Sequence, residues 1–140
     1  MLMTDCVVED AYEVYLASSD VEMTTTTVKY AYGNGIRIVG CSPVIRGCTI
    51  TGSSMDGIYI DDGASPTIVG CTIVDNDRGI YAFESSLELV VDNVIMLNEY
   101  GIYAERVDGV VHDNVVMLND NELFLLECDV VVEYNQFGYG

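Results

Sequence analysis

The sequence of 140 residues has few basic side chains: five lysines and arginines stand against 23 aspartates and glutamates, which gives a net charge of −18. A surface that binds the nucleic-acid backbone needs Lys and Arg, so nucleic-acid binding is excluded. The same shortage disfavours attachment to an anionic membrane. No apolar run approaches the ~20 residues that a bilayer span requires, so membrane insertion is excluded as well.

Signals for metal binding and for export are also scarce. The sequence has one histidine, His112, and its five cysteines show no CxxC spacing, so neither a zinc site nor any cofactor is expected. The first ten residues show no basic segment followed by an apolar one, and no secretion signal is visible. An odd number of cysteines without such a signal is typical of reduced thiols, which favours a cytoplasmic protein or a fragment of a larger protein.

An internal repeat, in contrast, runs through nearly the whole chain. The dipeptide Gly-Ile recurs every 22 residues, at Gly35, Gly57, Gly79 and Gly101. The related strings EVYL and ELFL begin at Glu13 and Glu122. We therefore expect a single domain, with a partial first coil at 1–12 and successive coils at 13–34, 35–56, 57–78, 79–100, 101–121 and 122–140.

Within each coil, apolar residues alternate with polar ones, and turn residues separate three short apolar runs. This pattern indicates three β-strands per coil and no helix, and hence an all-β parallel solenoid. Like residues stack in four inward columns: Val14, Ile36, Ile58, Ile80, Ile102 and Leu123; Leu16, Ile38, Ile60, Ala82, Ala104 and Leu125; Met23, Ile45, Ile68, Val90, Val111 and Val132; Val7, Val28, Ile50, Ile73, Ile95, Val116 and Phe137.

A second signature precedes the third strand of each coil. It reads CTI at Cys48 and Cys71, then NVI, NVV and NQF at Asn93, Asn114 and Asn135. N-x-I followed by G-I-x-I resembles the right-handed parallel β-helix repeat family, which includes pectate-lyase-like proteins and carbohydrate-binding and sugar-hydrolase type repeats. The resemblance covers about residues 5–138. It implies a right-handed single-stranded parallel β-helix, with the Asn position in the tight turn between the second and third strands.

Asparagines stacked in that turn can form a ladder, because an amide both donates and accepts hydrogen bonds and tolerates a left-handed backbone. The predicted ladder comprises Cys48, Cys71, Asn93, Asn114 and Asn135, continued backwards by Thr26 and Asp5. The two cysteines are expected to be reduced packing thiols. A disulfide between them is the alternative, but parallel stacked side chains fit its dihedral angle poorly.

A complete catalytic set of the lyases and hydrolases of this fold is not visible. The resemblance draws attention to Asp61 and Asp62, an acidic pair that follows a Gly-Ile strand, but the Gly-His-Gly and Arg-x-Lys elements of the polygalacturonases are missing from the sequence. We expect both aspartates to be solvated turn residues. His112 is expected to be solvated on the outer face of the second strand. No catalytic residue is assigned, and the sequence favours a protein that is not an enzyme.

The outward side of the first strand is rich in tyrosine. Flat aromatic faces stack on sugar rings, and neighbouring carboxylates accept hydrogen bonds from hydroxyls. In enzymes of the family that the sequence resembles, the polysaccharide groove runs along this face. The predicted ligand-binding residues are Tyr15, Arg37, Tyr59, Asp61, Tyr81, Tyr103 and Glu105. The alternative is that tyrosine simply favours strands and stacks on itself.

A second outward patch, on the third strand, is apolar and consists of Val94, Met96, Val115 and Met117. Exposed contiguous apolar patches usually mark interfaces. No capping helix is visible at either end of the sequence, and open solenoid ends favour association. These features predict a homo-oligomer, with a dimer favoured over a filament because the net charge opposes repeated stacking.

The prediction for function is therefore a non-catalytic β-helix scaffold with carbohydrate as its possible ligand. A self-assembling structural or interaction protein is the first alternative. An acidic decoy for a basic protein partner is the second.

Overall fold

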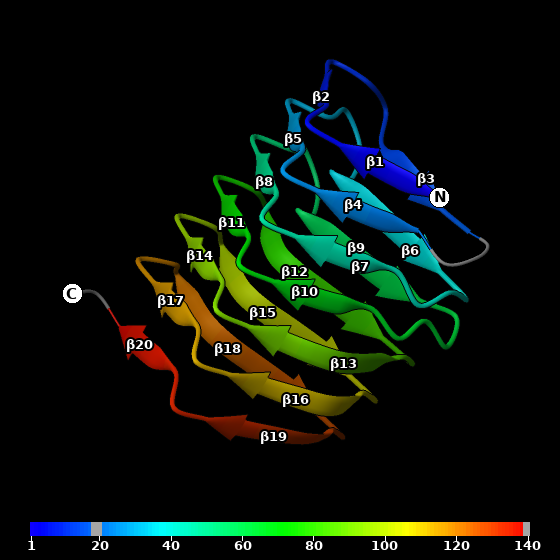
Figure 1. Ribbon diagram of the computed structural model, residues 1–140. Coiled ribbons are helices and arrows are strands. Elements are labelled where there is room, and N and C mark those ends of the chain that lie inside the picture. Colours follow the sequence, from blue (N-terminus) through cyan, green and yellow to red (C-terminus); the bar gives the residue numbers. More distant parts are fainter. Residues whose placement is uncertain (18–20, 139–140) are drawn as a thin grey trace.

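The structure is a computed structural model that describes residues 1–17 and 21–138. The described chain consists of strands and turns stacked into one solenoid, which runs from the strand Leu2–Thr4 in the first coil to the strand Gln136–Gly138 in the last (Figure 1). Each strand pairs in parallel with the strand at the same place in the next coil. The described residues form no helix of the length and apolar character that crossing a membrane requires.

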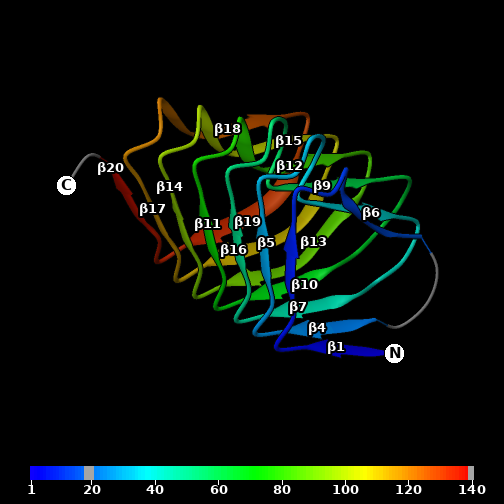
Figure 2. The same cartoon turned by 90° about the horizontal axis from the view of Figure 1, so that it is seen from above.

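Three parallel sheets, numbered by the order of their strands in a coil, enclose the interior (Figure 2). Sheet 1 contains the Gly-Ile strands, which are β3 (Val14–Leu16), β6 (Ile36–Val39), β9 (Ile58–Asp61), β12 (Arg78–Phe83), β15 (Tyr100–Glu105) and β18 (Asn121–Leu126). Sheet 2 contains β1 (Leu2–Thr4), β4 (Glu22–Thr24), β7 (Val44–Arg46), β10 (Thr67–Val69), β13 (Ser86–Val91), β16 (Asp108–His112) and β19 (Asp129–Glu133). Sheet 3 contains β2 (Val7–Glu9), β5 (Thr27–Lys29), β8 (Thr49–Thr51), β11 (Thr72–Val74), β14 (Val94–Met96), β17 (Val115–Met117) and β20 (Gln136–Gly138).

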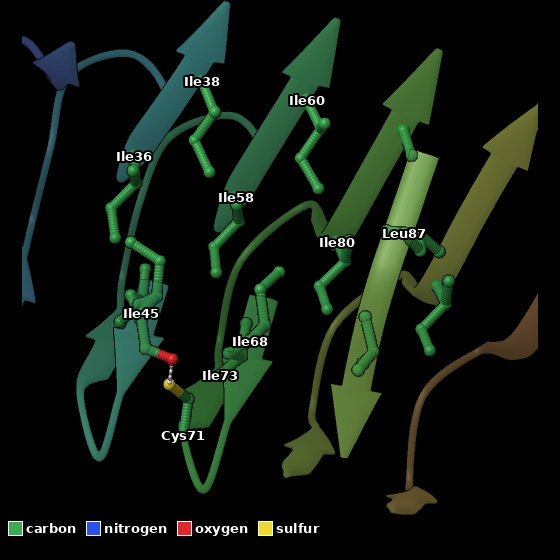
Figure 3. Close-up of a cluster of buried hydrophobic side chains, with 14 of the residues drawn as sticks. Ile36, Ile38, Ile45, Ile58, Ile60, Ile68, Cys71, Ile73, Ile80 and Leu87 are labelled. Atoms are coloured by element: carbon green, nitrogen blue, oxygen red, sulfur yellow. Dashed lines mark hydrogen bonds between the residues drawn. The ribbon is translucent and has the colours of Figure 1, made fainter. Parts of the chain in front are cut away.

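The core is built from the alternate residues of these strands, so that like side chains stack from coil to coil. Ile58 pairs with Ile36 on one side and Ile80 on the other, and all three are fully buried (Figure 3). Ile68 lies between Ile45 and Val90 in the same way. The predicted columns of sheets 1 and 2 are confirmed by the register.

The prediction for the first coil is wrong by one residue. Val7 pairs with Thr27 and is 64% exposed, whereas Val8 lies opposite the buried Val28. The column steps by only 20 residues from Val8 to Val28, so counting back by 21 ends one residue too far toward the N-terminus. For the same reason the ladder continues to Cys6, and not to Asp5: the Cys6 amide donates to Thr26 Oγ1 at 3.4 Å.

The turn between sheets 2 and 3 carries the stacked amides. Asn93 Oδ1 accepts the Cys71 N–H at 2.8 Å, and Asn114 Oδ1 accepts the Asn93 N–H at 3.0 Å. The Asn93 amide in turn donates to the carbonyl of Ile68 in the preceding coil, at 3.0 Å. Each buried asparagine therefore joins three coils and satisfies backbone groups that water does not reach.

The cysteines that replace asparagine in this turn donate a hydrogen bond to the equivalent carbonyl, but they have no oxygen that could accept the backbone N–H of the preceding coil. Cys48 Sγ donates to the Met23 carbonyl at 3.4 Å, and Cys71 Sγ donates to the Ile45 carbonyl at 3.5 Å (Figure 3). These carbonyls are the equivalents, in earlier coils, of the Ile68 carbonyl that Asn93 contacts. All five cysteines are free thiols.

A second amide ladder, which was not predicted from the sequence, lies in the turn between sheet 3 and the next coil. Asn98 Oδ1 accepts the Asn76 N–H, and Asn119 Oδ1 accepts the Asn98 N–H, both at 2.9 Å. Asn76 Oδ1 accepts the Ser53 N–H at 3.0 Å. The signal was present: an asparagine stands three residues before each of the last two Gly-Ile pairs, and again before Glu122.

The residue that follows each of the first six strands of sheet 3, from β2 to β17, adopts a left-handed backbone. At this place the successive coils carry Asp10, Tyr30, Gly52, Asp75, Leu97 and Leu118, with φ between 55° and 70°. Leucine is an unusual residue here, because a side chain without a local hydrogen bond costs about 1–2 kcal/mol in this conformation. Leu97 and Leu118 are also 55% and 41% exposed.

Candidate functional site

The outward face of sheet 1 brings most of the predicted ligand-binding residues into one column. The register stacks Tyr15, Arg37, Tyr59, Tyr81, Tyr103 and Phe124 in this order. Asp61 and Glu105 lie two residues further along their strands, in coils that are not adjacent. The residues share one face, as the alternation of the Gly-Ile strands requires.

From Tyr59 to Phe124, the rings of this column pack on one another. The Tyr59 and Tyr81 centroids are 5.1 Å apart with an interplanar angle of 23°, and those of Tyr103 and Phe124 are 4.6 Å apart at 18°. The ring faces therefore point along the solenoid axis, and the outer surface consists of ring edges and hydroxyls. In the middle of this column the ring faces are therefore not free to stack on a sugar ring.

The residue before each Gly-Ile pair forms a neighbouring column. Its side chains cover the tyrosine rings in some coils and leave a hollow in others. Arg78 and Tyr100 cover the tyrosines: the Arg78 guanidinium carbon is 3.9 Å from the Tyr81 centroid, and the Tyr100 ring meets the Tyr103 ring edge-on at 5.2 Å. In the two preceding coils the equivalent residues are Asn34 and Asp56, which turn inward and are buried. Short buried side chains replace bulky covering ones there, and the surface is hollow.

The hollow is a pocket of about 240 Å³, lined by Asn34, Arg37, Met55, Asp56, Tyr59 and Arg78. Pockets for drug-sized ligands measure roughly 300–1,000 Å³, so this one suits a single ring or its substituent. The lining combines a carboxylate, an amide, two guanidinium groups, one aromatic ring and a thioether. Only Arg37 and Tyr59 of this lining belong to the predicted set of ligand-binding residues.

The floor of the pocket is a buried ion pair. Asp56 is only 1% exposed, and its Oδ1 accepts a hydrogen bond from Arg78 Nε at 2.8 Å. Its backbone N–H donates to Asn34 Oδ1 at 3.1 Å, which fixes the position of both residues. Burial raises the pKa of Asp56 above its usual range, and the hydrogen bond from Arg78 opposes this shift. The pair places a buried carboxylate beside a partly exposed guanidinium.

The wall of the pocket is formed by Arg37, which lies between the rings of Tyr15 and Tyr59 at 5.7 and 5.5 Å from their centroids. Its Nη2 reaches Asp61 Oδ2 at 3.4 Å. Arg37 Nε is buried and has no hydrogen-bond partner among the described residues. Desolvation, with the negative charge of Asp61, raises the pKa of Tyr59 above its ordinary value.

The two consecutive aspartates do not form an acid–base pair. Asp61 is the last residue of β9, and its side chain is only 17% exposed, beside Arg37. The prediction that Asp61 is a solvated turn residue is therefore wrong, because Asp61 belongs to the strand and its side chain lies against Arg37. Asp62 lies in the turn with a φ of 55°, as predicted.

The remaining predicted residues lie away from the pocket. Glu105 stacks between Phe83 and Leu126 and contacts Arg106 at 3.5 Å. His112 ends β16 on the outer face of sheet 2, and its Nδ1 contacts Asp113 Oδ2 at 2.6 Å. Within the described residues, no group of three or more His, Cys, Asp or Glu side chains is placed to hold a metal ion.

The predicted interface residues share the outer face of sheet 3. Val94 pairs with Val115, and Met96 pairs with Met117. All four side chains are half-buried and point away from the core. This face and the pocket lie on different sheets.

Four lining residues of the pocket were not predicted from the sequence: Asn34, Met55, Asp56 and Arg78. An acidic or amide residue before glycine is typical of a solvated turn. The available signal was the contrast within one column, in which Asn34 and Asp56 give way to Arg78 and Tyr100 in the following coils.

Comparison with known proteins supports the architecture. A family profile described as "Right handed beta helix region" matches residues 2–138. Neither a curated protein nor a solved structure matches the chain. Because the profile spans nearly the whole sequence and the described strands form a parallel solenoid with three sheets, the chain belongs to the right-handed β-helix family.

Proposed function

We propose that this β-helix is a non-catalytic scaffold that binds carbohydrate on the outer face of sheet 1, with the pocket beside Tyr59 as the centre of the site. The observation that carries the proposal is the composition of the pocket: Asp56, Asn34 and two arginines converge on one hollow beside an aromatic ring. Sugar hydroxyls both donate and accept hydrogen bonds, so they match a site that offers a carboxylate, an amide and guanidinium groups together.

The arrangement favours one saccharide ring in the pocket, with the rest of the saccharide lying along the edges of the tyrosine rings. The pocket volume of about 240 Å³ accommodates one ring. Beyond it, the hydroxyls of Tyr81 and Tyr103 follow at the spacing of the coils. Binding along these edges depends on hydrogen bonds, since the ring faces are covered by their neighbours.

The test is binding to a glycan array, followed by titration calorimetry with the best saccharide. Tyr59→Ala removes a pocket wall and is expected to weaken binding at least ~10-fold, equal to about 1.4 kcal/mol. Tyr81→Ala, outside the pocket lining, is expected to have a smaller effect. Tyr134→Ala is the control, because Tyr134 is strongly exposed in a turn between sheets 2 and 3.

Two outcomes would count against the proposal. One is the absence of any saccharide binding at high protein concentration. The other is an equal loss of affinity in the Tyr59 and Tyr134 variants, which would place the ligand outside the pocket.

A further inference from the structure

The outer face of sheet 3 carries few charged side chains. Its outward positions, from the first coil to the last, are Val7, Thr27, Thr49, Thr72, Val94, Val115 and Gln136 in one column, and Glu9, Lys29, Thr51, Val74, Met96, Met117 and Gly138 in the other. The charged side chains among them are Glu9 and Lys29, which pair with each other at 3.1 Å near the N-terminal end. The chain has 23 acidic residues, yet the rest of this face has none.

The apolar part of this face extends beyond the four residues predicted from the sequence. Leu97 and Leu118 directly follow Met96 and Met117, in the turns that border the sheet. Both leucines are exposed, and they lie in adjacent coils. We call the set Val74, Val94, Met96, Leu97, Val115, Met117 and Leu118 the Val–Met face.

The two leucines are unfavourable in an isolated molecule for two separate reasons. They expose large apolar side chains, and their φ of 59° is a conformation that favours Gly, Asn and Asp. One coil earlier, the same turn position holds Asp75, with the same φ. Burial of the leucines against another surface would compensate for both costs.

We infer that the Val–Met face is the contact surface of a homodimer, in which each chain lays this face on a second copy of itself. Two copies that each carry a net charge of −18 repel one another least where carboxylates are missing, and this face is such a region. A basic partner would instead be drawn to the acid-rich faces. Flat sheet faces pack on one another ~10 Å apart, which buries the valine, methionine and leucine stripes together.

A dimer formed in this way is closed, because each copy uses the same patch and a two-fold contact leaves none free for a third chain. The inference concerns sheet 3 and does not depend on carbohydrate binding at sheet 1. It also predicts the effect of salt: screening of the net charge strengthens the dimer.

Size-exclusion chromatography with light scattering, over a range of protein and salt concentrations, tests the inference. The expected species has twice the 15.3 kDa mass of one chain and becomes more abundant as salt increases. In the double variant Met96→Glu with Met117→Glu, the dissociation constant is expected to rise at least ~100-fold, because charges would be buried in the contact. Val110→Glu is the matched control, since it adds a charge to the outer face of sheet 2 and is expected to leave the dimer intact.

A second variant separates association from folding. Leu97→Asp with Leu118→Asp gives these turns the residue of position 75, so the fold is expected to remain intact by circular dichroism while the dimer is lost. A single 15.3 kDa species of the unchanged protein under all conditions would overturn the inference. A dimer that survives the two aspartates, that dissociates in salt, or that Val110→Glu disrupts equally would overturn it as well.

Discussion

Replacement of Asn98 by alanine is expected to lower the free energy of unfolding by about 3 kcal/mol or more. The Asn98 Oδ1 accepts the Asn76 N–H at 2.9 Å, and its Nδ2 donates to Asn119 Oδ1 at 3.0 Å and to the Ile73 carbonyl at 3.2 Å. All of these groups are buried, so alanine leaves the Asn76 N–H without a partner and removes the side-chain bonds to Asn119 Oδ1, which keeps the Asn98 N–H, and to the Ile73 carbonyl. The unsatisfied donor costs about 1–3 kcal/mol, and each lost hydrogen bond adds about 0.5–1.5 kcal/mol.

Urea unfolding, followed by far-ultraviolet circular dichroism, measures this loss. Asn121→Ala is the matched control: the chemical change is the same, but Asn121 is exposed on β18, and its replacement is expected to stay within about 0.5 kcal/mol. Equal effects of the two replacements would mean that the second amide ladder adds little to stability.

The second large effect is expected from Ile80→Ala, which should cost about 2–5 kcal/mol through lost burial and a residual cavity. Ile80 is fully buried between Ile58 and Ile102. The next residue, Tyr81, points outward, and Tyr81→Ala is expected to cost about 1 kcal/mol, from lost contacts with the neighbouring rings.

Because Ile80 and Tyr81 are adjacent on β12 and point to opposite sides, the comparison tests which side of the strand faces the core. Thermal and urea unfolding of both variants give the two losses under the same conditions. A greater loss in Tyr81→Ala than in Ile80→Ala would mean that the aromatic column supplies more stability than the core that it covers.

Much of the fold could be predicted because the same pattern of apolar and turn residues recurs in every coil. Each inward position occurs in six or seven coils, so an exception such as Ala82 does not obscure its column. The same logic failed for Val7, since a column has no second neighbour at its first member to fix the register. A step of 20 residues in place of 21 then inverts the strand, because neighbouring residues of a strand face opposite sides.

The candidate site was predictable only in part, for a different physical reason. Periodicity identifies which residues face outward, and it therefore identified Tyr59 and Arg37. It does not specify how outward side chains pack on one another, and the stacking of the rings and the covering of Tyr81 by Arg78 depend on such packing. The burial of Asp56 depends in addition on an ion pair between coils, which no single repeat encodes.

The constant length of one turn has a consequence for how this chain can acquire insertions. Two residues join sheet 2 to sheet 3 in every coil, and the stacked amides and thiols hold this turn to the coil before it. The connection from sheet 1 to sheet 2 varies, from two residues at 84–85 to five at 62–66. Within the longer one, a side chain added at Gly63 would meet nothing within 4 Å. Extra segments are therefore expected to be better tolerated at this corner of the solenoid than in the turn between sheets 2 and 3, where the stacked side chains hold the length constant.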